Sequence, residues 1–279
     1  MQKIEDVRTF WDTNPLFTGE SKYKQGSVEF FEEHRAICID DCFAGKMNTK
    51  LFPNIRVKEP KILDLGCGIG FWLIEIARKY ESATLFAGDL SSNSLEIAQK
   101  RCNLFKVYAN FSVQNAESMT YNNHSFDHIN CQGVVHHTPN TEMALAEIAR
   151  VLKPGGTASI SVYYKNFFLR NWNIFFKIFT ILHKFGFGLN GRGRENIYAI
   201  SNSDEIVRLY DGAKNPIGKS YTKKEFLAML TPYFEIIDVF YHFFPARSFP
   251  IKIPNKLHRI LELLFPFMIY VSVKKLYRN

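Results

Sequence analysis

The stretch that most constrains the fold is KILDLGCGIG, residues 61–70, where an apolar run reaches an aspartate and then breaks into three glycines. A short apolar run bounded by glycines is typical of a buried strand. The residues that follow, 71–80, place Leu73, Ile76 and Ala77 on one face of a helix. A glycine-rich turn between a strand and a helix allows the backbone to approach a ligand closely. This stretch therefore predicts a strand–turn–helix unit with a ligand at its turn.

The rest of the chain continues this alternation of strands and helices. Helical patterns occupy 91–102 and 141–156, the second with Leu152 on its apolar stripe and Pro154-Gly155-Gly156 as its expected stop. Strands that alternate with helices indicate βαβ units and a mostly parallel sheet covered on both faces. The predicted strands, seven in all with 61–65, are 84–89, 110–114, 126–135, 157–164, 234–243 and 268–275.

The chain is interpreted as a single domain, 1–279, with four unequal parts. Apolar residues make up 46% of the sequence, which is enough for one substantial core. Aromatic residues are frequent in 165–220, which is expected to be a helical insertion that forms a lid. The four parts are an N-terminal helical cap (1–58), a cofactor-binding core (59–164), this insertion (165–220), and the C-terminal strands and helices (221–279).

Charge and cysteine content limit the partners and the compartment. The net charge of +8 permits contact with nucleic acid or an anionic membrane surface without establishing either. The most apolar stretches, 166–189 and 257–273, do not resemble transmembrane helices because both carry charges. The cysteines are scattered, no signal peptide precedes them, and Cys38 and Cys42 lack a second pair to complete a zinc site. A reduced, cytoplasmic protein without a metal is expected.

The glycine spacing and the acid before it indicate the kind of ligand. Dinucleotide sites use G-x-G-x-x-G and hold a pyrophosphate, whereas Gly66, Gly68 and Gly70 are spaced G-x-G-x-G and follow Asp64. A carboxylate would repel a pyrophosphate, but it would attract the ammonium and sulfonium groups of S-adenosylmethionine. Asp89, at the end of the next strand, is positioned to accept hydrogen bonds from ribose hydroxyls. S-adenosylmethionine is therefore the expected cofactor.

Several ordered motifs resemble those of a known family. ILDLGCGIG, GDLS, NAESM and SFDHINCQGVVHHTPNTEMALAEIARVLKPGG resemble the class I S-adenosylmethionine-dependent methyltransferases, especially the ubiquinone/menaquinone-type and small-molecule branch. The resemblance implies a Rossmann-like, doubly wound sheet and methyl transfer that leaves S-adenosylhomocysteine. The family commonly has aspartate where this chain has Asn115, which is expected near adenine together with Ala116. The expected cofactor residues are Asp64, Gly66, Cys67, Gly68, Gly70, Asp89, Leu90, Asn115, Ala116 and Gln132.

The acceptor is expected at the carboxyl edge of the sheet, just past the fourth predicted strand. Methyl transfer often requires a base that removes a proton from the nucleophile, and histidine suits this role near neutral pH. His136 and His137 follow the fourth predicted strand, where they act either as that base or in shaping the loop. The insertion is expected to cover an apolar small-molecule acceptor with its apolar sides inward and its lysines outward, with at most weak peripheral membrane contact. Candidate acceptor contacts are Trp11, Tyr23, His34, Tyr163, Tyr210 and Asp211.

Other functions of the same fold are alternatives. A nucleic-acid or protein methyltransferase is one alternative, and the basic charge suggests the nucleic-acid enzyme. However, residues 131–134 read CQGV where amino-group enzymes usually carry Asp/Asn-Pro-Pro-Tyr/Phe, and the Pro-Cys of cytosine-carbon enzymes is absent there. A non-catalytic protein that binds S-adenosylmethionine is a second alternative. A dehydrogenase is disfavoured by Asp64 and by the glycine spacing.

Overall fold

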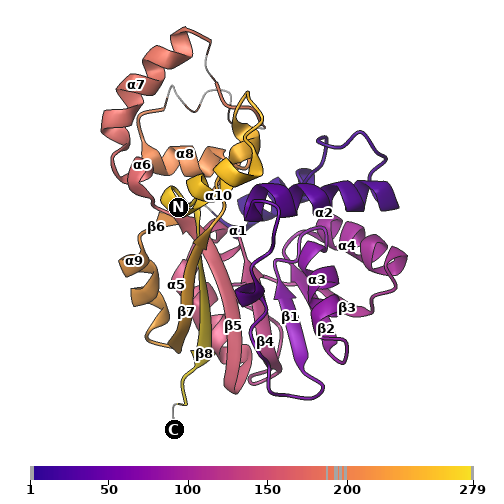
Figure 1. Cartoon of the computed structure of the whole chain (residues 1–279). Helices are drawn as coiled ribbons and strands as arrows, with labels where there is room; N and C mark the ends of the chain where they lie inside the picture. Colours follow the sequence, from indigo (N-terminus) through magenta and orange to yellow (C-terminus); the bar gives the residue numbers. More distant parts are fainter. Residues whose placement is uncertain (1–2, 187, 192–193, 195–196, 198–199, 278–279) are drawn as a thin grey trace.

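A large mixed sheet forms the centre of the computed structural model, which describes residues 3–186, 188–191, 194, 197 and 200–277. Its strands run in the order β3-β2-β1-β4-β5-β8-β7, with β6 beside β5 (Figure 1). The pairs among β1 to β5 are parallel, whereas β8 is antiparallel to both β5 and β7. The strands are β1 (Lys61–Leu65), β2 (Thr84–Asp89), β3 (Ala109–Val113), β4 (Phe126–Gln132), β5 (Leu152–Tyr164), β6 (Ser220–Tyr221), β7 (Phe234–His242) and β8 (Met268–Lys275).

Helices connect the strands and cover the sheet. The helix α9 begins at a capping box, in which the Thr222 hydroxyl accepts from the Glu225 N–H and the Glu225 carboxylate accepts from the Thr222 N–H. Short 3₁₀ turns include η1 (Thr49–Leu51), η2 (Val135–His137) and η4 (Ala246–Ser248). The helices are α1 (Ile4–Thr13), α2 (Val28–Phe43), α3 (Phe71–Lys79), α4 (Ser92–Leu104), α5 (Thr141–Val151), α6 (Phe167–Arg170), α7 (Trp172–Lys184), α8 (Ser203–Leu209), α9 (Lys223–Leu230) and α10 (Asn255–Leu264).

The predicted mostly parallel α/β sheet is confirmed, but it has eight strands rather than seven. The additional strand, β6, is only two residues long and pairs with the last two residues of β5. So short a strand has no sequence period that could predict it. The helix expected over 141–156 also ends earlier, at Val151, because Leu152 already pairs with Phe126 as the first residue of β5.

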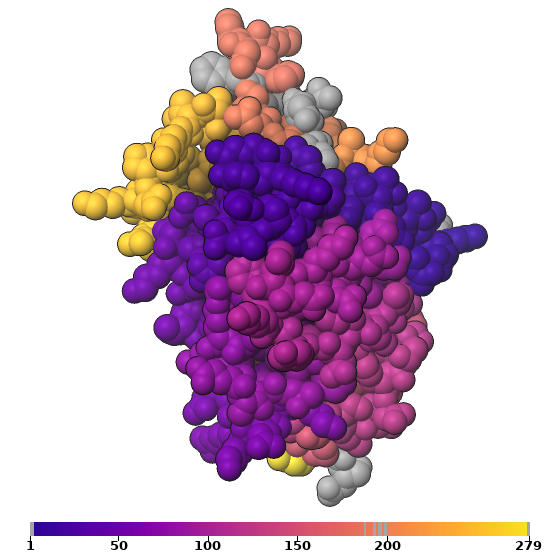
Figure 2. All heavy atoms as spheres, turned by 90° about the vertical axis from the view of Figure 1, so that its right-hand side faces the viewer, coloured from indigo at the N-terminus to yellow at the C-terminus, as the bar shows by residue number. Residues whose placement is uncertain are grey.

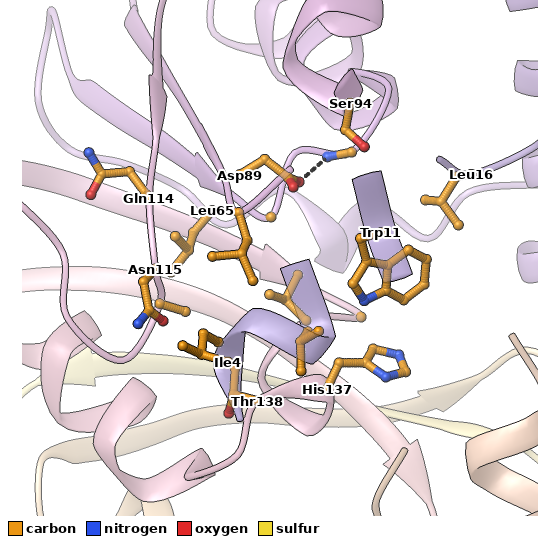
Figure 3. A pocket seen from close by; sticks show the side chains of 17 residues that line it. Ile4, Trp11, Leu16, Leu65, Asp89, Ser94, Gln114, Asn115, His137 and Thr138 are labelled. Atoms are coloured by element: carbon orange, nitrogen blue, oxygen red, sulfur yellow. Dashed lines mark hydrogen bonds between the residues drawn. The ribbon is translucent and has the colours of Figure 1, made fainter. Parts of the chain in front are cut away.

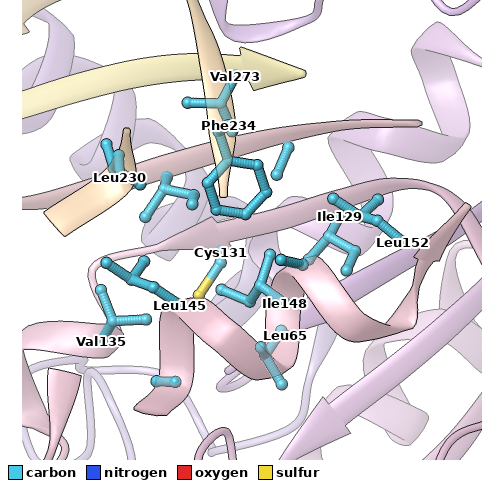
Figure 4. Packing of buried hydrophobic residues seen from close by; sticks show 14 of the residues in the cluster. Leu65, Ile129, Cys131, Val135, Leu145, Ile148, Leu152, Leu230, Phe234 and Val273 are labelled. Atoms are coloured by element: carbon cyan, nitrogen blue, oxygen red, sulfur yellow. The ribbon is translucent and has the colours of Figure 1, made fainter. Parts of the chain in front are cut away.

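Alternate residues of β1 pack on opposite faces of the sheet, as in a strand that is covered on both sides. Ile62 packs with residues of α3 on one face, whereas Leu63 and Leu65 belong to a cluster with α5 and α9 on the other. Figure 4 shows part of this second cluster, in which Ile148 of α5 lies close to Cys131 of β4. Full burial of one such apolar side chain contributes roughly 1.5–3 kcal/mol. The end of β1, and with it the glycine turn, is therefore anchored from both sides.

The carboxyl ends of the parallel strands are covered by segments from distant parts of the chain. In Figure 2, the indigo N-terminal segment lies between the magenta core below it and the salmon insertion above it. The insertion with α6, α7 and α8 is joined to the ends of β5 and β8 by an aromatic cluster that includes Tyr163, Trp172, Tyr210 and Phe267. This end of the molecule holds the candidate site.

The packing of α7 differs from the expected lid. Its inner side places Trp172 and Phe175 against the aromatic cluster, in agreement with the prediction. On its outer side, however, Ile174 and Ile178 are exposed together with Lys177. The expectation of apolar sides inward and lysines outward is therefore wrong for α7, which is apolar on both sides. Within the described ranges, no helix combines the length and the apolar character needed to cross a membrane.

Candidate functional site

A cavity of about 100 Å³ lies where β1, β2, β3 and β4 end, beneath α1 (Figure 3). The glycine turn after β1 and the loops after β2, β3 and β4 form one part of the cavity wall. Residues of α1 form another part. This is the edge at which open α/β sheets bind their ligands. The lining residues are Ile4, Val7, Trp11, Leu16, Leu65, Gly66, Gly68, Asp89, Leu90, Ser94, Gln114, Asn115, Ala116, Gly133, Val134, His137 and Thr138.

The turn after β1 needs glycine for both conformation and space. Gly66 has φ of +72°, and a Cβ there would lie 2.7 Å from Cγ1 of Val134. Gly70 has φ of +80°, and its Cβ would lie 3.2 Å from Cα of Ala98 in α4. A left-handed backbone strains residues that carry a Cβ. The turn can therefore pass close to the loop after β4 and to α4 only because these positions have no side chain.

Asp89 holds the same turn from the end of β2. Its Oδ2 accepts a hydrogen bond of 2.8 Å from the Gly68 N–H, drawn in Figure 3, and its Oδ1 accepts one of 2.9 Å from the Ser91 N–H. Burial raises the pKa of the Asp89 carboxyl above its ordinary value, while the N–H donors of Ser91, Gly68 and Leu90 oppose this rise. Each carboxylate oxygen retains a lone pair that can accept a ligand hydroxyl.

Asp64 lies behind the turn and is almost fully buried. Its Oδ1 accepts a hydrogen bond of 2.7 Å from the Asn130 side-chain amide, whose own oxygen accepts one of 3.1 Å from Gln132. Its Oδ2 is buried without a hydrogen-bond partner. Burial raises the pKa of Asp64 to about 7, against the effect of Asn130 and with a smaller contribution from the Asp89 charge. The buried Asp64, the half-buried Asp89 and an unused carboxylate oxygen fit a ligand that brings a positive charge to this turn.

The structure brings six of the ten expected cofactor residues to the cavity wall. These are Gly66, Gly68, Asp89, Leu90, Asn115 and Ala116. Asp64 and Gln132 stand behind the wall in the hydrogen-bonded chain through Asn130, while Cys67 packs into the apolar cluster with α3 and α4. Gly70 is the N-cap of α3. The Asn115 side-chain oxygen accepts a hydrogen bond of 3.0 Å from the Glu117 N–H.

Of the two adjacent histidines, only His137 lines the cavity. Its Nδ1 lies 2.6 Å from the Ile217 carbonyl, and because a carbonyl only accepts, Nδ1 carries the proton. Its Nε2 lies 3.4 Å from Oδ2 of Asp211, an oxygen that also accepts a hydrogen bond of 2.8 Å from the Tyr163 hydroxyl. His136 is fully buried, neither ring nitrogen has a hydrogen-bond partner, and burial lowers its pKa well below the ordinary value.

The other acceptor candidates separate into two groups. Trp11 lines the cavity with its ring 5.4 Å from that of His137, and Tyr210 packs behind Tyr163 with the ring centroids 5.9 Å apart. Tyr23 is exposed on the surface, away from the cavity wall. His34 is buried elsewhere, 3.2 Å from an Arg101 guanidinium nitrogen, and burial lowers its pKa to about 3. The structure does not bring these last two residues to the site.

Several lining residues were missed by sequence reasoning. Ile4 and Val7 line the cavity from α1, and the amphipathic spacing of 4–13 was the available signal. Gln114 also lines the cavity, although its side-chain amide donates a hydrogen bond of 2.7 Å to the Thr120 hydroxyl. That contact forms only in the folded chain, so no signal for it was present in the sequence. Asn130, the partner of Asp64, is itself buried within the buried strand β4, where no local pattern marks it. Among the described residues, no three His, Cys, Asp or Glu side chains are grouped to hold a metal ion.

Comparisons with known proteins agree with this geometry. Residues 62–156 match a family model described as a methyltransferase domain. These residues form a class I S-adenosylmethionine-dependent methyltransferase domain. The matched methyltransferase domain contains the glycine turn, both acids and His137, so the family prediction is confirmed and S-adenosylmethionine is indicated as its cofactor.

Individual relatives resemble only part of the chain. Methyltransferase GfsG of Streptomyces halstedii is 33% identical over 119 residues, which cover 42% of this chain and 42% of the relative. The ubiquinone biosynthesis O-methyltransferase of Coxiella burnetii is 28% identical over 113 residues, which cover 40% of this chain and 47% of the relative. The match therefore spans less than half of either relative. A solved S-adenosylmethionine-dependent methyltransferase from Methanosarcina mazei aligns with a TM-score of 0.57 and 21% identity, over 84% of this chain and 100% of that one, which supports the fold.

Proposed function

We propose that the protein transfers a methyl group from S-adenosylmethionine to a small-molecule acceptor. The observation that carries the proposal is the buried, unpartnered Oδ2 of Asp64 behind a glycine turn that is hydrogen-bonded to Asp89. When bound, the cofactor would supply a methyl group on a sulfonium, which leaves as a thioether. Asp64 would accept from its ammonium group, and Asp89 from its ribose hydroxyls.

The N-terminal helix α1 is the proposed cover of this site. The cavity of about 100 Å³ is smaller than the ~300–1,000 Å³ of typical ligand pockets. Ile4, Val7 and Trp11 of α1 line this cavity and limit its size. We infer that α1 shifts outward to admit the cofactor and then returns to exclude water, in the manner of an active-site lid.

His137 is the proposed base, and His136 is not. A proton removed from the acceptor would pass to His137 Nε2, because Nδ1 already carries a proton that it donates to Ile217. The Asp211 carboxylate, 3.4 Å away, would stabilise the resulting imidazolium, and the Tyr163 hydroxyl keeps that carboxylate in place. The buried His136 has no access to the cavity and serves to pack against Tyr163.

A small, partly apolar acceptor is favoured by the surroundings of His137. The ring of Trp11 lies at one side of the histidine and that of Tyr163 at the other, with centroids 5.4 and 5.8 Å from the imidazole. Relatives named as a ubiquinone biosynthesis O-methyltransferase and a phosphoethanolamine N-methyltransferase act on small molecules by name. The lid role of 165–220 is part of the proposal, since this segment supplies Asp211 and the Ile217 carbonyl.

Radiolabelled S-adenosylmethionine tests the proposal. The wild-type protein is incubated with a panel of phenolic and amine acceptors, and His137→Gln is compared with His124→Gln, a change at a histidine remote from the cavity. We expect turnover in the wild type and the control, and a loss of ~10²–10⁴-fold in His137→Gln with S-adenosylhomocysteine affinity retained. A loss below tenfold would remove His137 as base. If no acceptor in the panel or in a metabolite extract is methylated although the cofactor binds, the protein is a non-catalytic binder.

A further inference from the structure

The outer side of α7 is an exposed apolar stripe. Ile174, Ile178, Ile181 and Phe185 follow one another at intervals of four, three and four residues, which places them on one face of a helix. Their side chains are 65%, 51%, 57% and 77% exposed. Apolar residues exposed singly are ordinary, whereas a continuous stripe marks a surface that contacts something apolar.

The charges on this helix are all of one sign. Lys177 and Lys184 are exposed on α7, and the helix contains no Asp or Glu. Lys177 follows Ile174 by three residues and precedes Ile181 by four, so it stands at the edge of the apolar stripe, next to both isoleucines. A lysine side chain in such a place can lay its aliphatic stem along an apolar surface while its ammonium reaches polar groups.

A second amphipathic helix, α10, repeats this composition at the same end of the molecule (Figure 1). Leu257, Ile260 and Leu264 are 46%, 53% and 61% exposed, and Lys256 is exposed beside them. The only acid of α10, Glu262, is turned inward, where its Oε1 accepts a hydrogen bond of 2.8 Å from a backbone N–H. Contact between the rings of Phe168 and Phe265, 4.7 Å apart, ties the start of the insertion to the end of α10.

We propose that the outer faces of α7 and α10 dock on an anionic lipid bilayer, with the helices in the headgroup region. Amphipathic helices with apolar residues on one face and lysines at its margins bind such surfaces through apolar burial and attraction to anionic lipid. At ~1.5 Å per residue, the 13 residues of α7 extend about 20 Å, which is too short to cross the ~30 Å hydrocarbon core and suits a helix lying flat.

Lipid fits this surface better than a protein partner does. The centres of protein–protein interfaces are depleted of lysine, because a buried ammonium needs a carboxylate partner there. On a bilayer, the ammonium of Lys177 would reach the phosphate layer while Ile174 and Ile178 enter the acyl boundary. The cofactor cavity lies at the same end of the molecule, so docking would bring the cavity close to the membrane. The docking proposal itself does not depend on methyl transfer.

Sedimentation with lipid vesicles tests this surface. The full chain is mixed with vesicles of phosphatidylcholine alone or of phosphatidylcholine with phosphatidylglycerol. We expect binding to the anionic vesicles, weaker binding in high salt, and little binding to the neutral ones. Ile178→Glu should lower the partition coefficient at least ~10-fold, and Lys177→Gln about fivefold. Ile237→Glu, at a residue that is 53% exposed on β7, is the matched control and should bind like the wild type.

Two results would overturn the proposal. One is equal binding of Ile178→Glu and wild type to anionic vesicles, or no binding by either. The other is a dimer in analytical ultracentrifugation that Ile178→Glu dissociates, without vesicle binding, since the face would then join two copies of the chain. Affinity for S-adenosylhomocysteine, measured in the same variants, should be unchanged; this keeps failure of the docking surface distinct from failure of the proposed enzyme activity.

Discussion

Replacement of Asp64 by asparagine should raise stability and weaken cofactor binding at the same pH. The pKa of this buried carboxyl is about 7 in the folded protein, compared with an ordinary value of 3.8. Between these two pH values the folded state holds a proton that the unfolded state has released, so the free energy of unfolding decreases as pH rises. Above pH ~7 the full penalty is present, and a shift of about three units corresponds to an upper limit of ~4 kcal/mol.

Asp64→Asn removes this penalty and introduces a smaller one. The oxygen of the introduced amide can still accept the hydrogen bond from Asn130, but the amide N–H group replaces the unpartnered Oδ2 and remains unsatisfied, at a cost of ~1–3 kcal/mol. Without ligand, we therefore expect the variant to be more stable than wild type by roughly 1–3 kcal/mol near pH 8, and this advantage to decrease by about 2–3 kcal/mol near pH 5. Urea unfolding at the two pH values measures the difference, with Asp40→Asn, at an exposed acid, as control.

Cofactor binding should change in the opposite direction. An ammonium group beside Asp64 favours its ionised form, so the affinity of wild type for S-adenosylhomocysteine should increase from pH ~6 to ~8, by at most tenfold per unit below the pKa. Asp64→Asn should bind more weakly at pH ~8 and show a flatter pH profile. If the stability difference between variant and wild type is the same at both pH values, the carboxyl does not titrate as described, and the assignment of Asp64 to the ammonium loses its basis.

Three further changes test the supports of the site. Gly66→Ala should lower the free energy of unfolding by ~2–5 kcal/mol through backbone strain and overlap with Val134, and Val134→Ala in the same chain should restore the part due to overlap; no restoration would contradict the steric explanation. Thr222→Ala should cost ~1 kcal/mol in thermal unfolding through loss of the capping box, and an unchanged Tm would show that the box contributes nothing. Lys219 Nζ donates to the carbonyls of Thr138 and Pro139, each at 2.8 Å, so Lys219→Met should lower turnover by loosening the loop that carries His137; unchanged turnover would argue against that tether.

The order of strands and helices in the core was predictable because each element there has a clear local signal. The strand at Lys61–Leu65 is an apolar run that ends at glycines, and the structure has it with these bounds. Local sequence patterns do not predict an element whose conformation depends on pairing with neighbouring strands. Leu152 continues a helical stripe in the sequence, yet pairing with Phe126 assigns it to a strand, and the two-residue β6 exists only because β5 extends beyond β4.

The candidate site was predictable where residues close in sequence share a turn, and less so where distant segments meet. Gly68 and Asp89 were expected together because consecutive parallel strands end at one edge. His137 and Asp211 come together only when the insertion folds. The sequence therefore indicated each residue as a candidate, but not that the two are partners. His34 looked like a pocket residue, but α2 buries it beside Arg101 instead.

The most direct measurement of the central claim is calorimetric titration with S-adenosylhomocysteine. The wild-type protein should bind it at micromolar concentration and should not bind NAD. Asp89→Ala should weaken binding by about tenfold to 150-fold, since hydrogen bonds to a charged group contribute ~1.5–3 kcal/mol, whereas Asp40→Ala should bind like wild type. Absence of binding by the wild-type protein, or equal affinity in Asp89→Ala, would contradict the proposed cofactor site.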